Sequence, residues 1–390
     1  MTAATVTDTT GMASPALITA VSRLFAGAPG AGRPTVGIEL ELIPVRRGAR
    51  FRSPVPVEEL ASALHDVPWI AFEPGGQVEL NGPPEPTAAG AVTALADLWR
   101  RAADRLGTID VGLLPAGLDP WRANEQLGLQ LRSPRYVDMD RHFASVGPSG
   151  RSFMRQTAST QVCVGLAPGA AGAAQWRTAN RLAPVLAAIF ANAPLHEGRP
   201  LSGNGRRTAI CRSADPGRSG HGLPWSGPDP VTEYTDFAAR AEPISARFAG
   251  PEAVDAHLTT LFPPVRPRGT YLEIRAVDAL PLAEVASLVT MATVLLADPD
   301  AGECAAEAVA GSGLEMTELW DLAAGAGVRD PHLRRVAMTV IGVATAALEG
   351  FEPGYLPDDA PARLGALQRR VTNGQAPGDA LRRRLACRSR

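Results

Sequence analysis

Two carboxylates and an amide flank a Pro-Gly-Gly turn in residues 71–80. Glu73, Gln77 and Glu79 all occupy odd positions there, and alternate side chains of an extended backbone share one face. Carboxylates that are brought together repel each other unless one is protonated or a cation lies between them. This segment is therefore either one side of a divalent-metal site or a solvated polar turn.

A second pair of acids lies in residues 35–44, where apolar and polar residues alternate as in a strand. Glu39 and Glu41 fall on one face, opposite Val36, Ile38 and Leu40. Like charges two residues apart on one face of a strand repel. The pair fits a solvated edge, or a site that supplies a metal or a basic partner.

Two further segments alternate in the same way. Within residues 153–166, Thr157, Ser159 and Gln161 share one parity and offer small hydrogen-bonding groups. In residues 270–278, Glu273 and Arg275 share the polar face. This last pair either neutralises itself within a sheet or contributes to a common site.

Residues 192–227 are rich in glycine and arginine and are predicted to form a loop. This loop is either a solvated basic segment or a surface that binds phosphate, because guanidinium groups match phosphate oxygens. Its arginines are Arg199, Arg206, Arg207, Arg212 and Arg218.

One shared site explains these features better than separate accidents on four strands. No histidine or cysteine spacing typical of a metal site occurs, so the candidate ligands are all oxygens, which suit Mg²⁺ or Mn²⁺ rather than Zn²⁺. Acidic clusters near arginines are what phosphoryl transfer from a magnesium nucleotide requires. Nucleotide-loop motifs of the Walker and Rossmann types are absent.

The composition excludes several other classes of protein. The 390 residues carry a formal charge of -2, which gives no electrostatic reason to bind nucleic acid or an anionic membrane. The four cysteines are far apart in the sequence, so we expect free thiols. No secretory signal or bilayer-length apolar run is found. We expect a cytoplasmic protein that acts on small molecules as a monomer or weak homodimer.

The chemistry-bearing strands are predicted to belong to a single domain at 35–370. It follows a flexible N-terminal segment and linker at 1–34, with disorder up to about Thr9. It precedes an Arg-rich C-terminal tail at 371–390, whose end at 382–390 is expected to be a frayed helix. Residues 115–148 are expected to be irregular, as functional loops often are. Helices are predicted at 15–25, 58–65, 87–106, 176–193, 281–297, 302–310 and 332–348, and a further strand at 111–114.

The order and the residues of these motifs resemble those of the glutamate-cysteine ligase family, in its plant-type and actinobacterial branch. The most specific match is residues 73–80, which are similar to the family's E-P-G-G-Q-x-E-L. The other matches are residues 37–41 to G-x-E-x-E, Thr157 with 160–162 to T-x-Q-V, 190–194 to F-A-N-S-P, 271–275 to Y-L-E-x-R, and Arg207, Thr208, Ile210, Asp215 and 218–220 to a longer Arg-containing segment.

The resemblance implies an α+β, glutamine-synthetase-like fold, in which a curved antiparallel sheet forms a funnel with helices on its outer face. It implies metal ligation by Glu39, Glu41, Glu73, Glu79 and Glu273. Catalytic roles would fall to Arg275, Arg207, Arg218 and Gln77, and ATP would meet Arg207, Arg218, Arg268, Thr157 and Gln161.

The implied activity is an ATP- and Mg²⁺-dependent ligation, with Mn²⁺ as an alternative metal. The γ-carboxylate of glutamate becomes an acyl phosphate, which the amine of cysteine then attacks to give γ-glutamylcysteine. Cys211 replaces the family's usual Trp, and Arg268 is followed by Gly269 and Thr270 where a basic pair is common. Loss of an aromatic residue from this segment would reshape the pocket of the acceptor amine. Alternatives are a secondary-metabolism ligase that uses a different amine or a similar acid, and a noncatalytic relative that binds a nucleotide or an amino acid.

Overall fold

An antiparallel sheet forms the centre of the computed structural model, which describes residues 13–30, 32–245 and 253–386. Seven strands of the described residues form it in the order β2-β3-β1-β5-β9-β8, with β4 paired to β1. A separate hairpin pairs β6 with β7. The strands are β1 (Val36–Arg46), β2 (Ile70–Phe72), β3 (Val78–Asn81), β4 (Val111–Leu114), β5 (Ser159–Gly165), β6 (Leu195–His196), β7 (Arg199–Pro200), β8 (Val265–Pro267) and β9 (Tyr271–Asp278).

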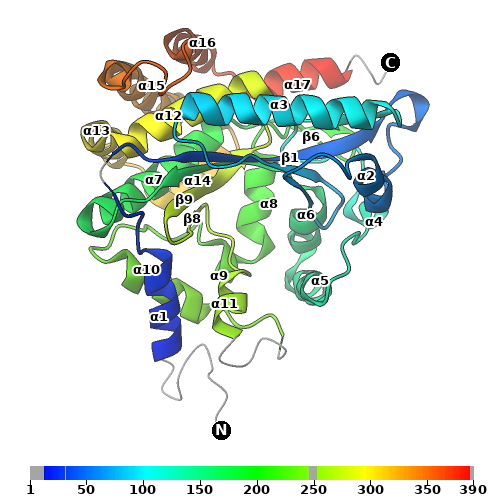
Figure 1. Ribbon diagram of the computed structural model, residues 1–390, viewed down its shortest axis with the longest axis horizontal. Helices are drawn as coiled ribbons and strands as arrows, with labels where there is room; N and C mark the ends of the chain where they lie inside the picture. The colour runs from blue at the N-terminus through cyan, green and yellow to red at the C-terminus, as the bar shows by residue number, and fades with distance from the viewer. Residues whose placement is uncertain (1–12, 31, 246–252, 387–390) are drawn as a thin grey trace.

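One face of the sheet is covered by three long helices, α3 (Ala88–Gly107), α7 (Gly169–Ile189) and α12 (Leu282–Ala297). The alternation of β1 explains the covering, because Ile38 and Leu40 are buried in the core on that face. Further helices complete this layer (Figure 1). They are α13 (Pro299–Ala310), α14 (Met316–Ala324), α15 (Pro331–Ala346), α16 (Ala360–Thr372) and α17 (Pro377–Ala386).

Short helices lie on the opposite side of the sheet, where Figure 1 shows α6 and α8 below β1. A small apolar cluster of Met139, Phe143, Met154 and Ala214 joins three of these helices, α5, α6 and α8, separately from the main core. The helices are α4 (Asn124–Leu127), α5 (Pro134–Val146), α6 (Pro148–Gln156), α8 (Arg206–Ala214), α9 (Pro216–Ser219), α10 (Pro230–Arg240) and α11 (Ala253–Leu258). Elsewhere lie α1 (Pro15–Leu24), α2 (Val57–Ala63) and the 3-10 turns Gly48–Arg50, Gly327–Arg329 and Ala347–Gly350.

The strongly patterned segments of the sequence form the predicted elements. The strands predicted at 35–44, 111–114 and 270–278 are confirmed as β1, β4 and β9. All seven predicted helices are confirmed within a few residues at their ends, except that α7 begins at Gly169, ahead of the predicted 176.

Two segments predicted to be loops contain helices instead. Residues 115–148 include α4 and α5, and the Gly/Arg-rich region includes α8 and α9. A cap followed by proline starts two of them, because the side chains of Ser133 and Asp215 accept hydrogen bonds from the first turns of α5 and α9. These helix starts are hard to recognise in the sequence, because both segments have a composition typical of loops.

The strand predicted within 153–166 and the C-terminal tail also need correction. Helix α6 continues to Gln156, so β5 begins only at Ser159. The prediction of a frayed tail is wrong for α17, because Leu381 and Leu385 are buried and Arg382 donates hydrogen bonds to main-chain oxygens of the loop before α8. Residues 387–390, like the disorder predicted up to Thr9, lie outside the described residues.

Helix α1, which lies within the N-terminal segment predicted to be flexible, packs against α10 and α11 and buries Leu17 and Val21. The division of the chain at 34 and 370 stays a prediction. Among the described residues, no single helix has both the length and the apolar character of a bilayer span. Helices α12 and α13 pass that test only as a pair bent by 104°.

The Pro-Gly-Gly turn is fixed by main-chain contacts. The N–H of Gly76 donates to the oxygen of Glu73 at 2.8 Å, and the N–H of Glu73 donates to the oxygen of Gln77 at 2.9 Å. Gly76 has a φ of +88°, a value that glycine adopts without strain. The turn thus folds Glu73 back toward the strand that carries Glu79.

We expect Gly75→Ala to lower the free energy of unfolding by about 1–3 kcal/mol, because the added Cβ would collide with the main-chain carbonyl of Arg155 on α6. Urea denaturation measures the change. Gly342→Ala on α15 is the matched control, because its Cβ meets no atom within 4 Å and alanine favours helices, so stability should stay the same or rise by up to about 1 kcal/mol. Equal losses in both variants would contradict the close approach at Gly75.

Candidate active site

Three glutamates converge on the sheet face opposite the long helices. Glu41 on β1 is paired in register with Glu79 on β3, and the Pro-Gly-Gly turn brings Glu73 beside them. Each of the three offers an oxygen within 4.8 Å of the others. Glu39, two residues before Glu41, lines the same cavity. Three close oxygen donors fit a hard divalent cation.

Crowding of these acids changes their protonation. Burial raises the pKa of Glu73 well above its usual range, and the charges of Glu41 and Glu79 raise it further. Burial also raises the pKa of Glu79 to about 8, with Glu41 and Glu39 adding to the effect. Without a cation, the cluster therefore holds protons near neutral pH.

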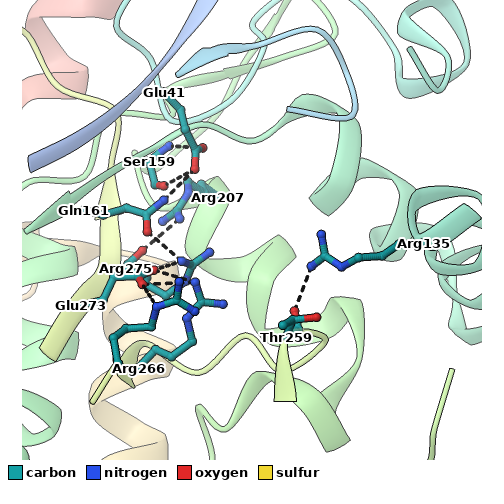
Figure 2. A network of polar contacts seen from close by, with 10 residues as sticks. Glu41, Arg135, Ser159, Gln161, Arg207, Thr259, Arg266, Glu273 and Arg275 are labelled. Atoms are coloured by element: carbon teal, nitrogen blue, oxygen red, sulfur yellow. Dashed lines mark hydrogen bonds and ion pairs between the residues drawn. The ribbon is translucent and has the colours of Figure 1, made fainter. Parts of the chain in front are cut away.

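Glu41 is the most firmly held of the three. One of its oxygens accepts the main-chain N–H of Ser159 at 2.7 Å, and the other accepts the Ser159 hydroxyl at 2.8 Å and the Gln161 amide Nε2 at 3.0 Å. Three donors fix the orientation of this carboxylate. Figure 2 shows these contacts between Glu41, Ser159 and Gln161.

Arginines form the other side of the site. Arg266 and Arg275 both contact Glu273, and Arg268 lies 3.5 Å from it. Burial and the neighbouring Arg266 lower the pKa of Arg275 to about 10, so this guanidinium stays charged at neutral pH. With three guanidinium groups around one carboxylate, this region keeps a surplus of positive charge.

Gln161 joins the two sides. Its amide nitrogen donates to Glu41, and its amide oxygen accepts a hydrogen bond from Arg275 Nη1 at 2.7 Å. Arg207 approaches from α8, and its two terminal nitrogens donate to the main-chain oxygens of Arg275 and Ala276. Figure 2 shows Arg135 of α5 across from this network, with a hydrogen bond to the oxygen of Thr259.

A cavity of about 210 Å³ lies between the acidic and basic groups. Apolar and aromatic side chains from α5, α6 and the loop before β8 form part of its remaining walls. The lining comprises Glu39, Glu41, Glu73, Pro74, Gln77, Glu79, Arg135, Tyr136, Met139, Phe153, Met154, Thr157, Ser159, Gln161, Arg207, Phe262, Arg266 and Arg275.

Nine of the twelve residues that were predicted for the site line this cavity, and the structure accounts for the other three differently. Glu273 is 1% exposed and is enclosed by arginines, so in this structure it is their counter-ion and not a member of the glutamate cluster. Arg268 faces Glu273 and does not line the cavity. Arg218 is buried behind the wall, where it pairs with Asp215 and donates to the Thr260 hydroxyl.

The structure also gives contacts for Gln77, a predicted residue of the site, and for Cys211, the residue that replaces the family's usual Trp. The Gln77 amide accepts from Gly75 N and donates to the oxygen of Thr157, which ties the turn to the start of β5. Cys211 is buried and is absent from the cavity lining, and burial raises the pKa of its thiol. These findings favour an inert, packed cysteine.

Sequence reasoning missed Arg135, Tyr136, Arg266 and the apolar wall. The Ser133-Pro134 helix start would have placed Arg135 and Tyr136 on a helix instead of in a loop. Strand β8 spans only Val265–Pro267, too short to show alternation around Arg266.

Comparison with known proteins decides the family. Residues 35–389 match the family described as glutamate-cysteine ligase family 2 (GCS2). The chain belongs to this family. It is 33% identical over 369 residues to the glutamate-cysteine ligase EgtA of Mycolicibacterium smegmatis, covering 85% of this chain and 82% of that protein. It is 27% identical to the chloroplastic glutamate-cysteine ligase of Arabidopsis thaliana, over 80% of this chain and 65% of that one.

Solved structures confirm the fold class. A glutamate-cysteine ligase from Francisella tularensis, crystallised in complex with AMP, matches with a TM-score of 0.59 at 13% identity, over 89% of this chain and 83% of that one. A bifunctional glutathione synthetase from Pasteurella multocida matches with a TM-score of 0.52 at 15% identity, over 95% and 50%. The fold is glutamine-synthetase-like, with an antiparallel sheet that does not close. As a member of this ligase family, the protein is an ATP-dependent carboxylate-amine ligase.

The raised pKa of Glu79 predicts how stability depends on pH. Between its ordinary value of 4.5 and about 8, the folded protein without metal keeps a proton that the unfolded chain has released. Stability should therefore fall as pH rises through this range. A divalent cation that binds the ionised carboxylates should restore stability, and more so at higher pH.

Thermal melts of chelator-treated protein at a series of pH values, with and without Mg²⁺, measure both effects. Glu79→Gln is the control, because its side chain does not titrate and its melting temperature should vary less with pH. A melting temperature of the chelated wild type that rises between pH 6 and 8 would contradict the prediction.

Proposed function

We propose that the protein forms γ-glutamylcysteine from glutamate and cysteine at the expense of ATP. The observation that carries the proposal is the single cavity with opposite walls, Glu41, Glu73 and Glu79 on one side and Arg207, Arg266 and Arg275 on the other. Such a cavity fits a polyanion bound together with a divalent cation. Family membership supplies the reaction type.

Magnesium is the cation we propose, held by Glu41, Glu73 and Glu79, with Glu39 next to them. The donors are all carboxylate oxygens close enough to share an ion. Burial, and after it the charges of the neighbouring glutamates, raises the pKa of Glu73 and Glu79, which a bound cation would counteract. A bound divalent cation would neutralise charge on the transferred phosphoryl group. Glu273 stays a predicted ligand, although its contacts with arginines argue for a different role.

The arginines would bind the anionic groups of the substrates. Arg266 and Arg275 form the positive side toward which the phosphates of ATP would be drawn, and the buried setting strengthens this attraction. Arg207, fixed on the main chain of β9, would meet a phosphate or the carboxylate of glutamate. Thr157 and Gln161 stay predicted nucleotide contacts. In this structure Gln161 already uses both ends of its amide within the protein.

The chemistry proceeds in two steps. The γ-carboxylate oxygen of glutamate bonds to the γ-phosphorus of ATP, and ADP leaves. The neutral amine of cysteine then attacks the acyl carbon, inorganic phosphate leaves, and the amine gives up a proton as the amide forms. Enclosure by Tyr136, Phe153 and Phe262 limits access of water to the acyl phosphate, which hydrolysis would otherwise waste.

Amine-dependent release of ADP tests the proposal. With Mg²⁺, ATP and glutamate, addition of cysteine should release ADP and yield γ-glutamylcysteine, whereas omission of any one component should abolish release. A panel of other amines and of other acids is run alongside. Turnover with a different amine but not with cysteine would replace the proposed acceptor, and no release with any pair would overturn the ligase reaction.

Glu79→Gln should lower kcat/KM at least about 100-fold, because the loss of one ligand weakens charge neutralisation worth several kcal/mol. The fold should survive, because the substitution removes one of several carboxylates that repel each other. Circular dichroism and a melting curve check the fold, and steady-state ADP release measures activity. Glu58→Gln on the exposed face of α2 is the matched control and should leave activity unchanged. Full activity of Glu79→Gln would contradict the placement of the metal.

A further inference from the structure

Asp278 ends strand β9 just outside the cavity. Its side chain is 2% exposed and does not line the cavity, so it has no direct access to a substrate. One carboxylate oxygen accepts the main-chain N–H of Asn192 at 2.6 Å. The other lies 3.8 Å from Arg207 Nη1.

The chain leaves space for this carboxylate. A Cβ at Gly117 would collide with the Asp278 side chain. The main chain is held tightly there. The N–H of Gly117 donates to the oxygen of Asn192 at 3.0 Å, and the carbonyl oxygen of Gly117 accepts the N–H of Ala158 at 3.1 Å. Burial raises the pKa of Asp278 to about 6, with Arg207 and the Asn192 N–H opposing the rise, so the group is ionised at pH 7.

The position of Arg207 depends on its contacts with β9 and with Asp278. Its side chain is 8% exposed, and its terminal nitrogens donate to the main-chain oxygens of Ala276 at 3.2 Å and Arg275 at 3.0 Å. These neutral acceptors do not balance its charge, whereas the carboxylate of Asp278 does. Its Nε is buried and has no hydrogen-bond partner among the described residues. A donor is thus left over at a residue that lines the cavity.

We propose that Asp278 is a positioning residue, which holds the Arg207 guanidinium against β9 so that Arg207 binds an anionic group of the substrates. The inference rests on the proposed function and extends it to a residue outside the cavity. The anionic group is either the α-carboxylate of the amino acid or a phosphate of ATP. Both present oxygens that a guanidinium recognises.

Asp278→Asn tests this role, because the amide keeps the shape of the side chain and an oxygen for the Asn192 N–H. We expect KM for one substrate to rise about tenfold while kcat changes less than about threefold, the pattern of lost binding without lost chemistry. Titration of glutamate at saturating ATP, and of ATP at saturating glutamate, shows which anion Arg207 binds. Asp330→Asn, which loses a carboxylate that caps α15, is the control and should leave both KM values unchanged.

A double-mutant cycle with Arg207→Gln separates positioning from a purely structural role. If Asp278 acts through Arg207, Asp278→Asn should add no further rise in KM once Arg207 is gone. Additive effects, or unchanged KM values in Asp278→Asn, would overturn the proposal. If Asp278→Asn does not fold, Asp278→Glu, which keeps the charge but moves it, carries the same cycle.

Equilibrium binding keeps this test independent of turnover. Calorimetric titration with glutamate, and with a non-hydrolysable ATP analogue, should show the same tenfold loss for one ligand in Asp278→Asn. Absence of ADP release from the wild type would overturn the ligase reaction alone. Equal affinities of wild type and Asp278→Asn for both ligands would overturn the positioning role alone.

Discussion

Repulsion among buried carboxylates is the interaction on which the site depends. Glu41, Glu73 and Glu79 lie close together in a region of low polarity, where like charges are costly. The protein accepts this cost and supplies donors to only part of the cluster, with Ser159 and Gln161 at Glu41 and the Asn81 amide at Glu79. The negative charge that these donors do not offset gives the cluster an affinity for cations and protons. In this structure the raised pKa values favour protonation of Glu73 and Glu79, and the proposed cation would compete with those protons.

The sheet makes this concentration of charge achievable. The same alternation that sends Ile38 and Leu40 into the core sends Glu39 and Glu41 to the other face, so burial of the apolar side anchors the acidic one. Antiparallel pairing then places Glu79 opposite Glu41 without any special contact. Strand β9 brings Arg275 to the same face two strands away, with Glu273 as its counter-ion. A single repeating geometry therefore sets both signs of charge on the cavity wall.

The parts of the site that lie on patterned strands could be predicted from the sequence, and the parts on irregular segments could not. Glu39 and Glu41 are predicted to share a strand face because their strand alternates over ten residues, and Glu73 and Glu79 are predicted from their specific turn motif. All four line the cavity. The resemblance to the ligase family assigns Glu273 to the metal ligands, whereas strand parity alone also allows it to pair with Arg275, as it does in this structure. Arg266, which helps to enclose Glu273, lies on a strand too short to show any period. Arg135 was missed since its helix is polar on the surface and apolar only toward a small satellite cluster.

The amide of Gln161 gives the site a direction. An amide has one end that donates and one that accepts, and here the donating end meets a carboxylate and the accepting end meets a guanidinium. Rotation of the amide by half a turn would bring oxygen against oxygen at Glu41 and nitrogen against nitrogen at Arg275. Electrostatics therefore favours one orientation of this side chain, although the side chain itself is uncharged. A neutral residue in this way keeps the acidic and basic walls apart, so that they do not collapse onto each other as an ion pair and close the space that a substrate must enter.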